Sequence, residues 1–171
     1  GRDVVCADEG EKVSIPPDLS RAAFVSGKFE PSLLDGADEV VISPGIHMEH
    51  PLMAEAASRG IPVIGELELA FRHASAPVIA VTGTNGKSTT VSMIGEILKA
   101  AGKDAIVAGN VGVPFSGVAE SLGPDGFFVI EVSSFQLEAI REFRPASAGL
   151  RTLTPDHLAR YRSLDAYYRL K

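Results

Sequence analysis

The chain has 171 residues, of which 45% are hydrophobic and 22% are charged, a composition typical of a globular protein. Its formal net charge of −6 gives no basic footprint for nucleic acid, and no apolar run approaches the roughly 20 residues that cross a membrane. We therefore expect no nucleic-acid partner and no membrane insertion. The single cysteine, Cys6, excludes an internal disulfide and fits a reducing cytoplasm. We expect Cys6 to be a small buried residue on a strand.

Strand and helix patterns alternate along the first half of the chain. Strands are predicted at residues 4–7, 40–42 and 61–64, and helices at residues 51–60 and 66–72. This alternation is typical of an α/β fold with a parallel sheet. We expect residues 1–75 to form a Rossmann-like domain that ends in a linker at residues 73–77.

The second half continues the same alternation. A buried strand at residues 77–81 and a helix at residues 91–102 enclose a glycine-rich run, and further strands are predicted at residues 127–132 and 146–150. Thr154 followed by Pro155 is typical of a helix start, and residues 167–171 also have a helical pattern. We expect residues 76–171 to form a P-loop-type parallel-sheet ATPase domain.

Both domains are expected to be incomplete. The chain opens directly into a strand, whereas a nucleotide-binding domain normally begins with a complete strand and glycine turn, and it closes inside a predicted helix. We therefore interpret the chain as a fragment of a longer protein, and we expect this fragment by itself to be inactive.

The run TGTNGKST at residues 82–89 is the strongest functional signal. Its glycines let backbone N–H groups turn inward, and the start of a helix adds partial positive charge. Lys87 can reach the outer phosphates of ATP, and the Ser88 hydroxyl can bind Mg²⁺. The spacing is shorter than in the Walker A pattern, which would place glycine where this chain has Val81. A structural turn is the alternative, but the flanking strand and helix favour phosphate binding.

Glu131 ends the strongly apolar strand at residues 127–132. Ligands gather at the carboxyl ends of strands in α/β sheets, and a carboxylate is costly to bury unless a cation meets it. We therefore expect Glu131 to bind Mg²⁺. The alternative is a plain helix start, in which Ser133 or Ser134 caps the next helix; this explains the serines but not a buried Glu131.

Three further motifs are ambiguous by themselves. His157 would lie on the first turn of the helix that Thr154 begins, and a lone histidine is more often structural than a ligand. The run SPGI at residues 43–46 ends a strand and could offer N–H groups to a phosphate, or it could be a simple turn. The run GNVG at residues 109–112 could present Asn110 to a ligand, or it could also be a turn.

Taken together, these segments resemble the Mur ligase family of peptidoglycan biosynthesis. The resemblance spans nearly the whole chain, in family order, through SPGI (43–46), GIPVIGELEL (60–69), TGTNGKST (82–89), GNVG (109–112), EVSSFQLE (131–138) and LTPDHL (153–158). The stretch SSFQLE is similar to the D-glutamate-adding members. The diaminopimelate- or lysine-adding members usually have Ser-Ser-His there, and folylpolyglutamate synthases diverge after Glu-Val.

The resemblance implies three domains: a Rossmann-like domain that holds the UDP part, a central ATPase domain, and a third domain that brings the amino acid. It implies that ATP, with Mg²⁺ as cofactor, phosphorylates the carboxylate of UDP-N-acetylmuramoyl-L-alanine. The amine of D-glutamate would then attack the acyl phosphate, leaving an amide, ADP and phosphate. On this basis we expect a cytoplasmic, monomeric ligase.

The resemblance also implies roles for individual residues. Those that would contact ATP are Gly83, Thr84, Asn85, Gly86, Lys87, Ser88 and Thr89. Those with catalytic or metal-binding roles are Lys87, which steadies the phosphates, Ser88 and Glu131, which hold one Mg²⁺, and His157 and a carbamylated Lys171, which hold a second. Those that would contact the other substrates are Ser43, Gly45, Asn110, Ser133 and Gln136.

Some positions depart from the family pattern. Thr152 stands where the family usually has asparagine, Ala159 stands where it usually has aspartate, and Arg151 is unexpected beside a strand end. Lys171, considered without the resemblance, would be a solvated surface residue.

Two alternatives to a ligase stay open: a nucleotide-binding module without catalysis, and a generic P-loop ATPase.

Overall fold

The computed structural model describes residues 3–10, 22–157, 159–161 and 163–171. The chain divides into two compact units. Unit 1 comprises Gly1–Val40 and Glu49–Pro62, and unit 2 comprises Val41–Met48 and Val63–Lys171. Within the described ranges, no helix is both long and apolar enough to cross a membrane.

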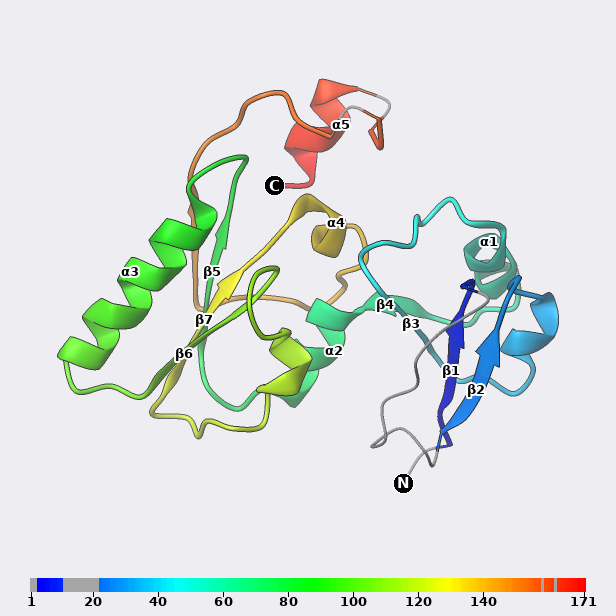
Figure 1. The fold of residues 1–171 in the computed structure, drawn as a ribbon, viewed down its shortest axis with the longest axis horizontal. Coiled ribbons are helices and arrows are strands. Elements are labelled where there is room, and N and C mark those ends of the chain that lie inside the picture. The colour runs from blue at the N-terminus through cyan, green and yellow to red at the C-terminus, as the bar shows by residue number, and fades with distance from the viewer. Residues whose placement is uncertain (1–2, 11–21, 158, 162) are drawn as a thin grey trace. The chain divides into compact units, whose positions relative to one another are not determined.

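The described part of unit 1 contains two short parallel strands and a helix. Strands β1 (Val5–Asp8) and β2 (Ala23–Ser26) pair with Val5 opposite Ala23. A 3₁₀ turn, η2 (Pro31–Leu34), and helix α1 (Pro51–Ser58) follow in the described part of the unit (Figure 1). Strand β1 begins one residue later than predicted, strand β2 was not predicted, and Cys6 on β1 is only half-buried.

Helix α1 is fixed at both ends by its own sequence. His50 Nδ1 accepts the N–H of Leu52 at 3.1 Å, and Pro51 occupies the first helical position, where its missing N–H costs nothing. At the other end, the Arg59 guanidinium donates to Glu55 Oε1 at 2.7 Å and Asp35 Oδ1 at 2.8 Å. These bonds join the end of α1 to the segment after η2.

Unit 2 is built on a four-stranded sheet with strand order β6-β7-β5-β8 (Figure 1). Its strands are β5 (Val78–Thr82), β6 (Ala105–Gly109), β7 (Phe127–Glu131) and β8 (Ser147–Leu150). All three pairings in this sheet are parallel, which confirms the α/β class expected from the sequence. A separate two-stranded sheet consists of β3 (Val40–Ile42) and β4 (Val63–Gly65).

Helices cover both faces of the larger sheet. The helical elements of unit 2 are α2 (Glu66–His73), α3 (Lys87–Ala100), η3 (Phe115–Gly117), α4 (Ser134–Leu137) and α5 (Leu164–Arg169). On one face, Val81 and Val129 pack against Val91 of α3. On the other, Phe128 and Ile130 pack against Leu67 of α2 and Phe115 of η3. Alternate residues of each strand thus fill two separate apolar clusters.

The register of the sheet brings the segments that follow three strands together at the carboxyl ends of those strands. Glu131 lies opposite Val81 of β5 on one side and opposite Gly109 of β6 on the other. A side chain at Gly109 would collide with the Glu131 carbonyl oxygen, and Gly109 has a φ of +111° that favours glycine. The loop after β5, the end of β7 and the turn after β6 are therefore neighbours.

A buried carboxylate links α2 to the segment after α4. Glu68 is 0% exposed, and its oxygens accept the backbone N–H groups of Arg141, Glu142 and Phe143 at 2.8–3.0 Å. The Arg72 guanidinium donates to the same carboxylate at 3.0 Å. Burial alone would raise the pKa of Glu68, but these donors lower it below its ordinary value.

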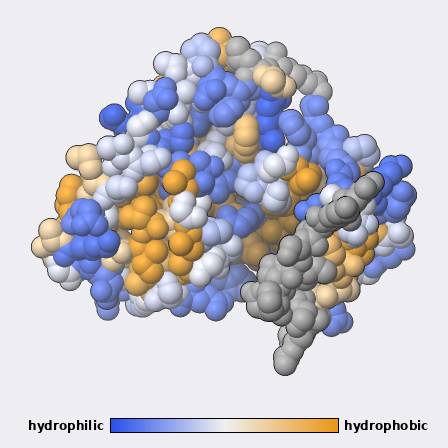
Figure 2. All heavy atoms as spheres, in the orientation of Figure 1, coloured by the Kyte–Doolittle hydropathy of each residue, from blue (hydrophilic) through white to orange (hydrophobic). Residues whose placement is uncertain are grey.

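The surface of unit 2 is mixed in character. Patches of hydrophobic and hydrophilic residues alternate over the face shown in Figure 2. Met93 and Ile97, one turn apart on α3, are 59% and 64% exposed. The helical pattern at residues 91–102 therefore does not divide cleanly into a buried and a polar face.

The region after β8 differs from its prediction. Residues 151–157 are not helical, and His157 has a φ of 52°, so the helix expected from Thr154 and Pro155 is wrong. The backbone of Thr154 instead binds the Thr84 side chain. Helix α5 begins after Ser163, whose hydroxyl accepts the N–H of Ala166. It ends at Arg169, so Lys171 lies beyond the helix in which it was expected.

Candidate functional site

The glycine-rich loop joins β5 to α3 in the arrangement that the sequence predicts. Strand β5 ends at Thr82 and α3 begins at Lys87, four residues before the apolar pattern starts. Gly86 precedes the helix with a φ of +79°. Among the described residues no side chain caps this helix, and the N–H groups of a first helical turn have no partner within the helix. Such an end is suited to bind an anion.

Two lysine ammonium groups lie at this loop. Lys87 Nζ donates to the carbonyls of Gly83 and Thr84, each at 2.9 Å. Lys171 Nζ donates to Thr82 Oγ1 at 3.1 Å and to the Gly83 carbonyl at 3.0 Å. Residues 84 positions apart in the chain thus supply two cations to a single turn, and both use the Gly83 carbonyl.

The environment of Lys171 favours its neutral form more than water does. Burial lowers the pKa of its amine, and the neighbouring charge of Lys87 lowers it further, while Asp156 partly offsets both, leaving it at about 8. The ammonium also lies 5.3 Å from the centre of the Tyr167 ring. Lys171 is therefore not the solvated surface residue that its sequence position alone suggests.

Residues 152–154 bind the loop from the side. The Thr84 N–H donates to the Thr152 carbonyl at 2.7 Å, and the Asn85 N–H donates to Thr152 Oγ1 at 2.9 Å. Thr84 Oγ1 donates to the Thr154 carbonyl at 3.0 Å and accepts the Thr154 N–H at 3.1 Å. The Tyr167 hydroxyl is a further partner of Thr84 Oγ1 at 3.0 Å. Thr152, a departure from the family pattern, thus has a structural task in this chain.

Glu131 has the environment expected of a cation ligand. It is 2% exposed, and Asn110 Nδ2 donates to its Oε1 at 2.9 Å. Its other oxygen, Oε2, is buried without a hydrogen-bond partner among the described residues. A buried unpaired carboxylate oxygen at the end of β7, beside the phosphate loop, fits a hard cation such as Mg²⁺. Ser88, its predicted co-ligand, is exposed on the first turn of α3.

His157 has different surroundings. It is half-exposed, its ring lies 4.8 Å from that of Phe135, and its Nε2 lies 3.4 Å from Asp156 Oδ2. Among the described residues, no group of three His, Cys, Asp or Glu side chains is placed to hold a metal ion. The role of His157 in a second metal site stays a prediction. Leu158, the last residue of the LTPDHL motif, lies outside the described residues.

The predicted substrate contacts have structural partners of their own. Ser133 and Gln136 form a capping box at the start of α4: Ser133 Oγ accepts the Gln136 N–H at 3.3 Å, and Gln136 Oε1 accepts the Ser133 N–H at 3.0 Å. Ser43 and Gly45 are exposed, and the Ile46 N–H closes a turn on the Ser43 carbonyl at 3.0 Å. Substrate binding by these residues stays a prediction.

Arg160 was not predicted from any sequence motif. Its guanidinium forms a two-pronged ion pair with Glu138 at 2.9 and 2.7 Å, and its Nη2 also donates to the Ile46 carbonyl at 3.2 Å. It stacks 4.2 Å over the Phe135 ring. Arg160 thus joins α4 to the turn at residues 43–46. Only its partners, which lie 22 and 114 positions away in the chain, reveal this role.

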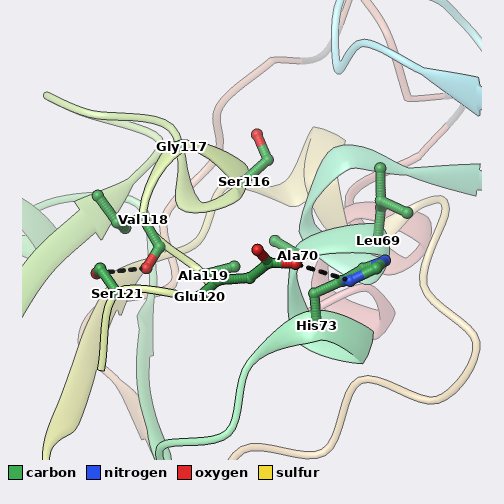
Figure 3. Close-up of a pocket in the computed structure, with 9 residues that line it drawn as sticks. All are labelled: Leu69, Ala70, His73, Ser116, Gly117, Val118, Ala119, Glu120 and Ser121. Atoms are coloured by element: carbon green, nitrogen blue, oxygen red, sulfur yellow. Dashed lines mark hydrogen bonds and ion pairs between the residues drawn. The ribbon is translucent and has the colours of Figure 1, made fainter. Parts of the chain in front are cut away.

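A pocket of about 510 Å³ lies apart from these residues, between α2 and the segment that contains η3. Figure 3 shows His73 and Glu120 facing each other across it, with His73 Nδ1 3.3 Å from Glu120 Oε1. None of its lining residues is a predicted site residue.

Comparison with known proteins decides the family. The model of the Mur ligase middle domain matches residues 81–171, more than half of the chain, and that of the MurD-like N-terminal domain of Mur ligases matches residues 2–65. The chain belongs to the Mur ligase family. Both halves of this Mur ligase chain are thereby accounted for, and the family resemblance read from its motifs is confirmed.

The curated relatives carry the name UDP-N-acetylmuramoylalanine–D-glutamate ligase. The protein from Caldanaerobacter subterraneus subsp. tengcongensis is 39% identical over 176 residues, covering 100% of this chain and 39% of its own length. That from Trichlorobacter lovleyi is 42% identical over 176 residues, covering 100% and 40%. That from Alkaliphilus oremlandii is 48% identical over 134 residues, covering 78% and 30%. The chain thus spans about two fifths of the length of relatives that it matches throughout.

A solved structure shows the same fold. The UDP-N-acetylmuramate:L-alanyl-gamma-D-glutamyl-meso-diaminopimelate ligase from Neisseria meningitides matches with a TM-score of 0.54 and 24% identity, covering 98% of this chain and 58% of that one. At this level of identity the match speaks for the fold alone.

Proposed function

We propose that the complete protein is an ATP-dependent ligase that joins D-glutamate to UDP-N-acetylmuramoyl-L-alanine, the reaction named for its curated relatives. The observation that carries the proposal is the pairing of a buried Glu131 carboxylate oxygen, which has no hydrogen-bond partner among the described residues, with a glycine-rich loop that holds the ammonium group of Lys87. This combination suits a polyphosphate and its metal ion.

The proposed reaction has two steps. A carboxylate oxygen of UDP-N-acetylmuramoyl-L-alanine attacks the γ-phosphorus of ATP, and ADP leaves. The amine of D-glutamate then attacks the acyl carbon, a C–N bond forms, phosphate leaves, and the amine loses a proton. Such transfers depend on positioning and charge neutralisation. Lys87 would exchange the carbonyls of Gly83 and Thr84 for phosphate oxygens, and the other residues of the loop from Gly83 to Thr89 would surround the phosphates.

Glu131 and Ser88 would hold one Mg²⁺, with Asn110 fixing the orientation of the Glu131 carboxylate through its 2.9 Å hydrogen bond. A bound Mg²⁺ neutralises charge on the phosphates. His157 and a carbamylated Lys171 would hold a second ion.

Carbamylation joins CO₂ to the neutral amine of Lys171 and releases a proton, so it depends on how readily that amine loses its charge. The pKa of about 8 supports this assignment, because the neutral amine is then accessible close to neutral pH.

The remaining sequence-based roles form part of the same proposal. Residues 1–75 would hold the UDP part, with Ser43 and Gly45 near its phosphates. Asn110, Ser133 and Gln136 would contact the muramoyl substrate, and residues 76–171 would hold ATP. Asn110, Ser133 and Gln136 already form hydrogen bonds within the protein. Substrate contacts would therefore have to use their remaining donors and acceptors.

The experiment that tests the proposal is an assay of the complete protein with ATP, Mg²⁺ and UDP-N-acetylmuramoyl-L-alanine, with D-glutamate or L-glutamate as the amine. We expect amide product and phosphate release with D-glutamate only. Phosphate release that needs neither substrate would indicate a generic P-loop ATPase. Nucleotide binding without turnover would indicate a non-catalytic module.

A further inference from the structure

Arg151 lies directly on the phosphate loop. It follows β8, and its N–H donates to the Thr82 carbonyl at 3.0 Å, which continues the pairing of β8 with β5. A side-chain carbon built on Gly86 would lie 3.2 Å from Arg151 Nε and 3.3 Å from its Nη2. The guanidinium therefore rests against the turn that precedes α3, where the unpaired N–H groups of the helix begin.

Unlike the two lysine ammonium groups, the Arg151 guanidinium forms no hydrogen bond with a described residue. Lys87 and Lys171 each donate to two oxygens of the loop. Over the part of the chain that the structure describes, no carboxylate, carbonyl or hydroxyl accepts a hydrogen bond from the Arg151 guanidinium, and the residue is exposed. A guanidinium offers five N–H donors in a planar fork that matches phosphate oxygens.

We propose that Arg151 is a phosphate-binding residue, whose guanidinium donates to the phosphate oxygens of ATP held on the loop. This inference rests on the proposed function, because it presupposes ATP at residues 83–89. The backbone of Arg151 is fixed by β8, so only its side chain has to adjust. It already lies beside Gly86, and among the described residues no hydrogen bond of the guanidinium has to break before it turns toward a phosphate.

Arginine at position 151 also departs from the family pattern, as does threonine at the neighbouring position 152. Thr152 uses its carbonyl and hydroxyl to bind the N–H groups of Thr84 and Asn85. Two successive residues after β8 therefore contact the loop: Thr152 holds its backbone, and Arg151 adds a cation to its outer side.

The test is the affinity for the Mg²⁺ complex of β,γ-methylene-ATP, measured by titration calorimetry on the complete protein and on its variants. Arg151→Leu keeps the side-chain stem and removes the fork, and Arg151→Lys keeps the charge alone. Arg144→Leu is the matched control, because Arg144 is an exposed arginine just before β8, at the opposite end of that strand. Affinity for UDP and the thermal unfolding midpoint report on the rest of the molecule.

We expect Arg151→Leu to weaken the ATP analogue about tenfold, which corresponds to about 1.4 kcal/mol, with a smaller loss for Arg151→Lys and none for Arg144→Leu. Affinity for UDP and the unfolding midpoint should stay at the wild-type values. Equal affinity of wild type and Arg151→Leu for the analogue would overturn the inference while leaving the proposed function intact. A parallel loss of UDP binding or of folding would assign Arg151 a structural role instead. If the wild type binds no analogue at all, the proposed function fails and the inference fails with it.

Discussion

Replacing Glu68 with glutamine should destabilise the protein strongly, although Glu68 lies on a helix whose pattern gives no sign of it. The carboxylate is 0% exposed and accepts hydrogen bonds from three successive backbone N–H groups and from Arg72. Glutamine keeps one acceptor oxygen but turns an NH₂ group toward those donors. Breaking a buried, charged hydrogen-bond network costs about 3–5 kcal/mol. The remaining acceptor and the removed burial cost of a charge reduce this, so we expect a loss of about 3 kcal/mol.

The pH dependence of stability provides a second signature of Glu68. Its folded pKa lies below its ordinary value of 4.5, so the unfolded chain binds a proton first as the pH falls. The contribution of Glu68 is therefore complete above pH 4.5 and is lost as the pH falls through the lower, folded pKa. Glu68→Gln should remove this part of the acid sensitivity.

Urea denaturation followed by circular dichroism, at pH 7 and at several values below pH 5, measures both effects. The matched control is Glu142→Gln, since the Glu142 side chain is 72% exposed and its ion pair with Arg72 is long, at 3.9 Å. We expect the control to change the free energy of unfolding by less than about 0.5 kcal/mol. A loss for Glu68→Gln no larger than that of the control, or an unchanged acid slope, would refute this reasoning.

Three other changes test the phosphate loop itself. Lys87→Ala should lower ligation at least about 10²-fold, because it removes a phosphate-clamping cation, with a nearly unchanged unfolding midpoint; near-normal turnover would count against the assignment. Lys171→Ala should lose activity and regain part of it with added acetate. In the wild type, the carbamate should give an NMR signal from bound ¹³CO₂ that fades as the pH drops below about 8, where the ammonium predominates. A signal that persists at pH 6 would contradict this. Tyr167→Phe removes the hydroxyl that contacts Thr84, so it should cost about 1 kcal/mol of unfolding free energy in urea; no change would mean that this hydrogen bond contributes nothing net.

Local patterns in the sequence predict most of the elements that hold the site. The apolar run before Thr82, the glycine at position 86 and the strand ending at Glu131 all carry their signals within a few residues. Strand β6 was missed because its sequence, AIVAG, is short and rich in alanine and glycine, which have low strand propensity. It pairs with β7 at the edge of the sheet, and its Val107 packs against the apolar cluster that includes Val91 of α3.

The features that local patterns missed depend on partners far along the chain. Thr154 followed by Pro155 predicts a helix, but the Thr84 side chain, 70 positions away, takes the backbone groups of Thr154. Lys171 has a lowered pKa because Lys87 and the surrounding protein meet it in space. Glu68 is buried because residues 141–143 bring three N–H groups to it. Periodicity and capping rules describe neighbours within one turn and do not reach such pairs.

The most direct test of the central claim follows a single oxygen atom. UDP-N-acetylmuramoyl-L-alanine labelled with ¹⁸O in the alanyl carboxylate is supplied to the complete protein with ATP, Mg²⁺ and D-glutamate, and the released phosphate is analysed by mass spectrometry. If the carboxylate attacks the γ-phosphorus and the amine then displaces phosphate, each phosphate carries away one carboxylate oxygen. The proposed function therefore predicts one ¹⁸O per phosphate when both carboxylate oxygens are labelled. Amide product accompanied by unlabelled phosphate would contradict it.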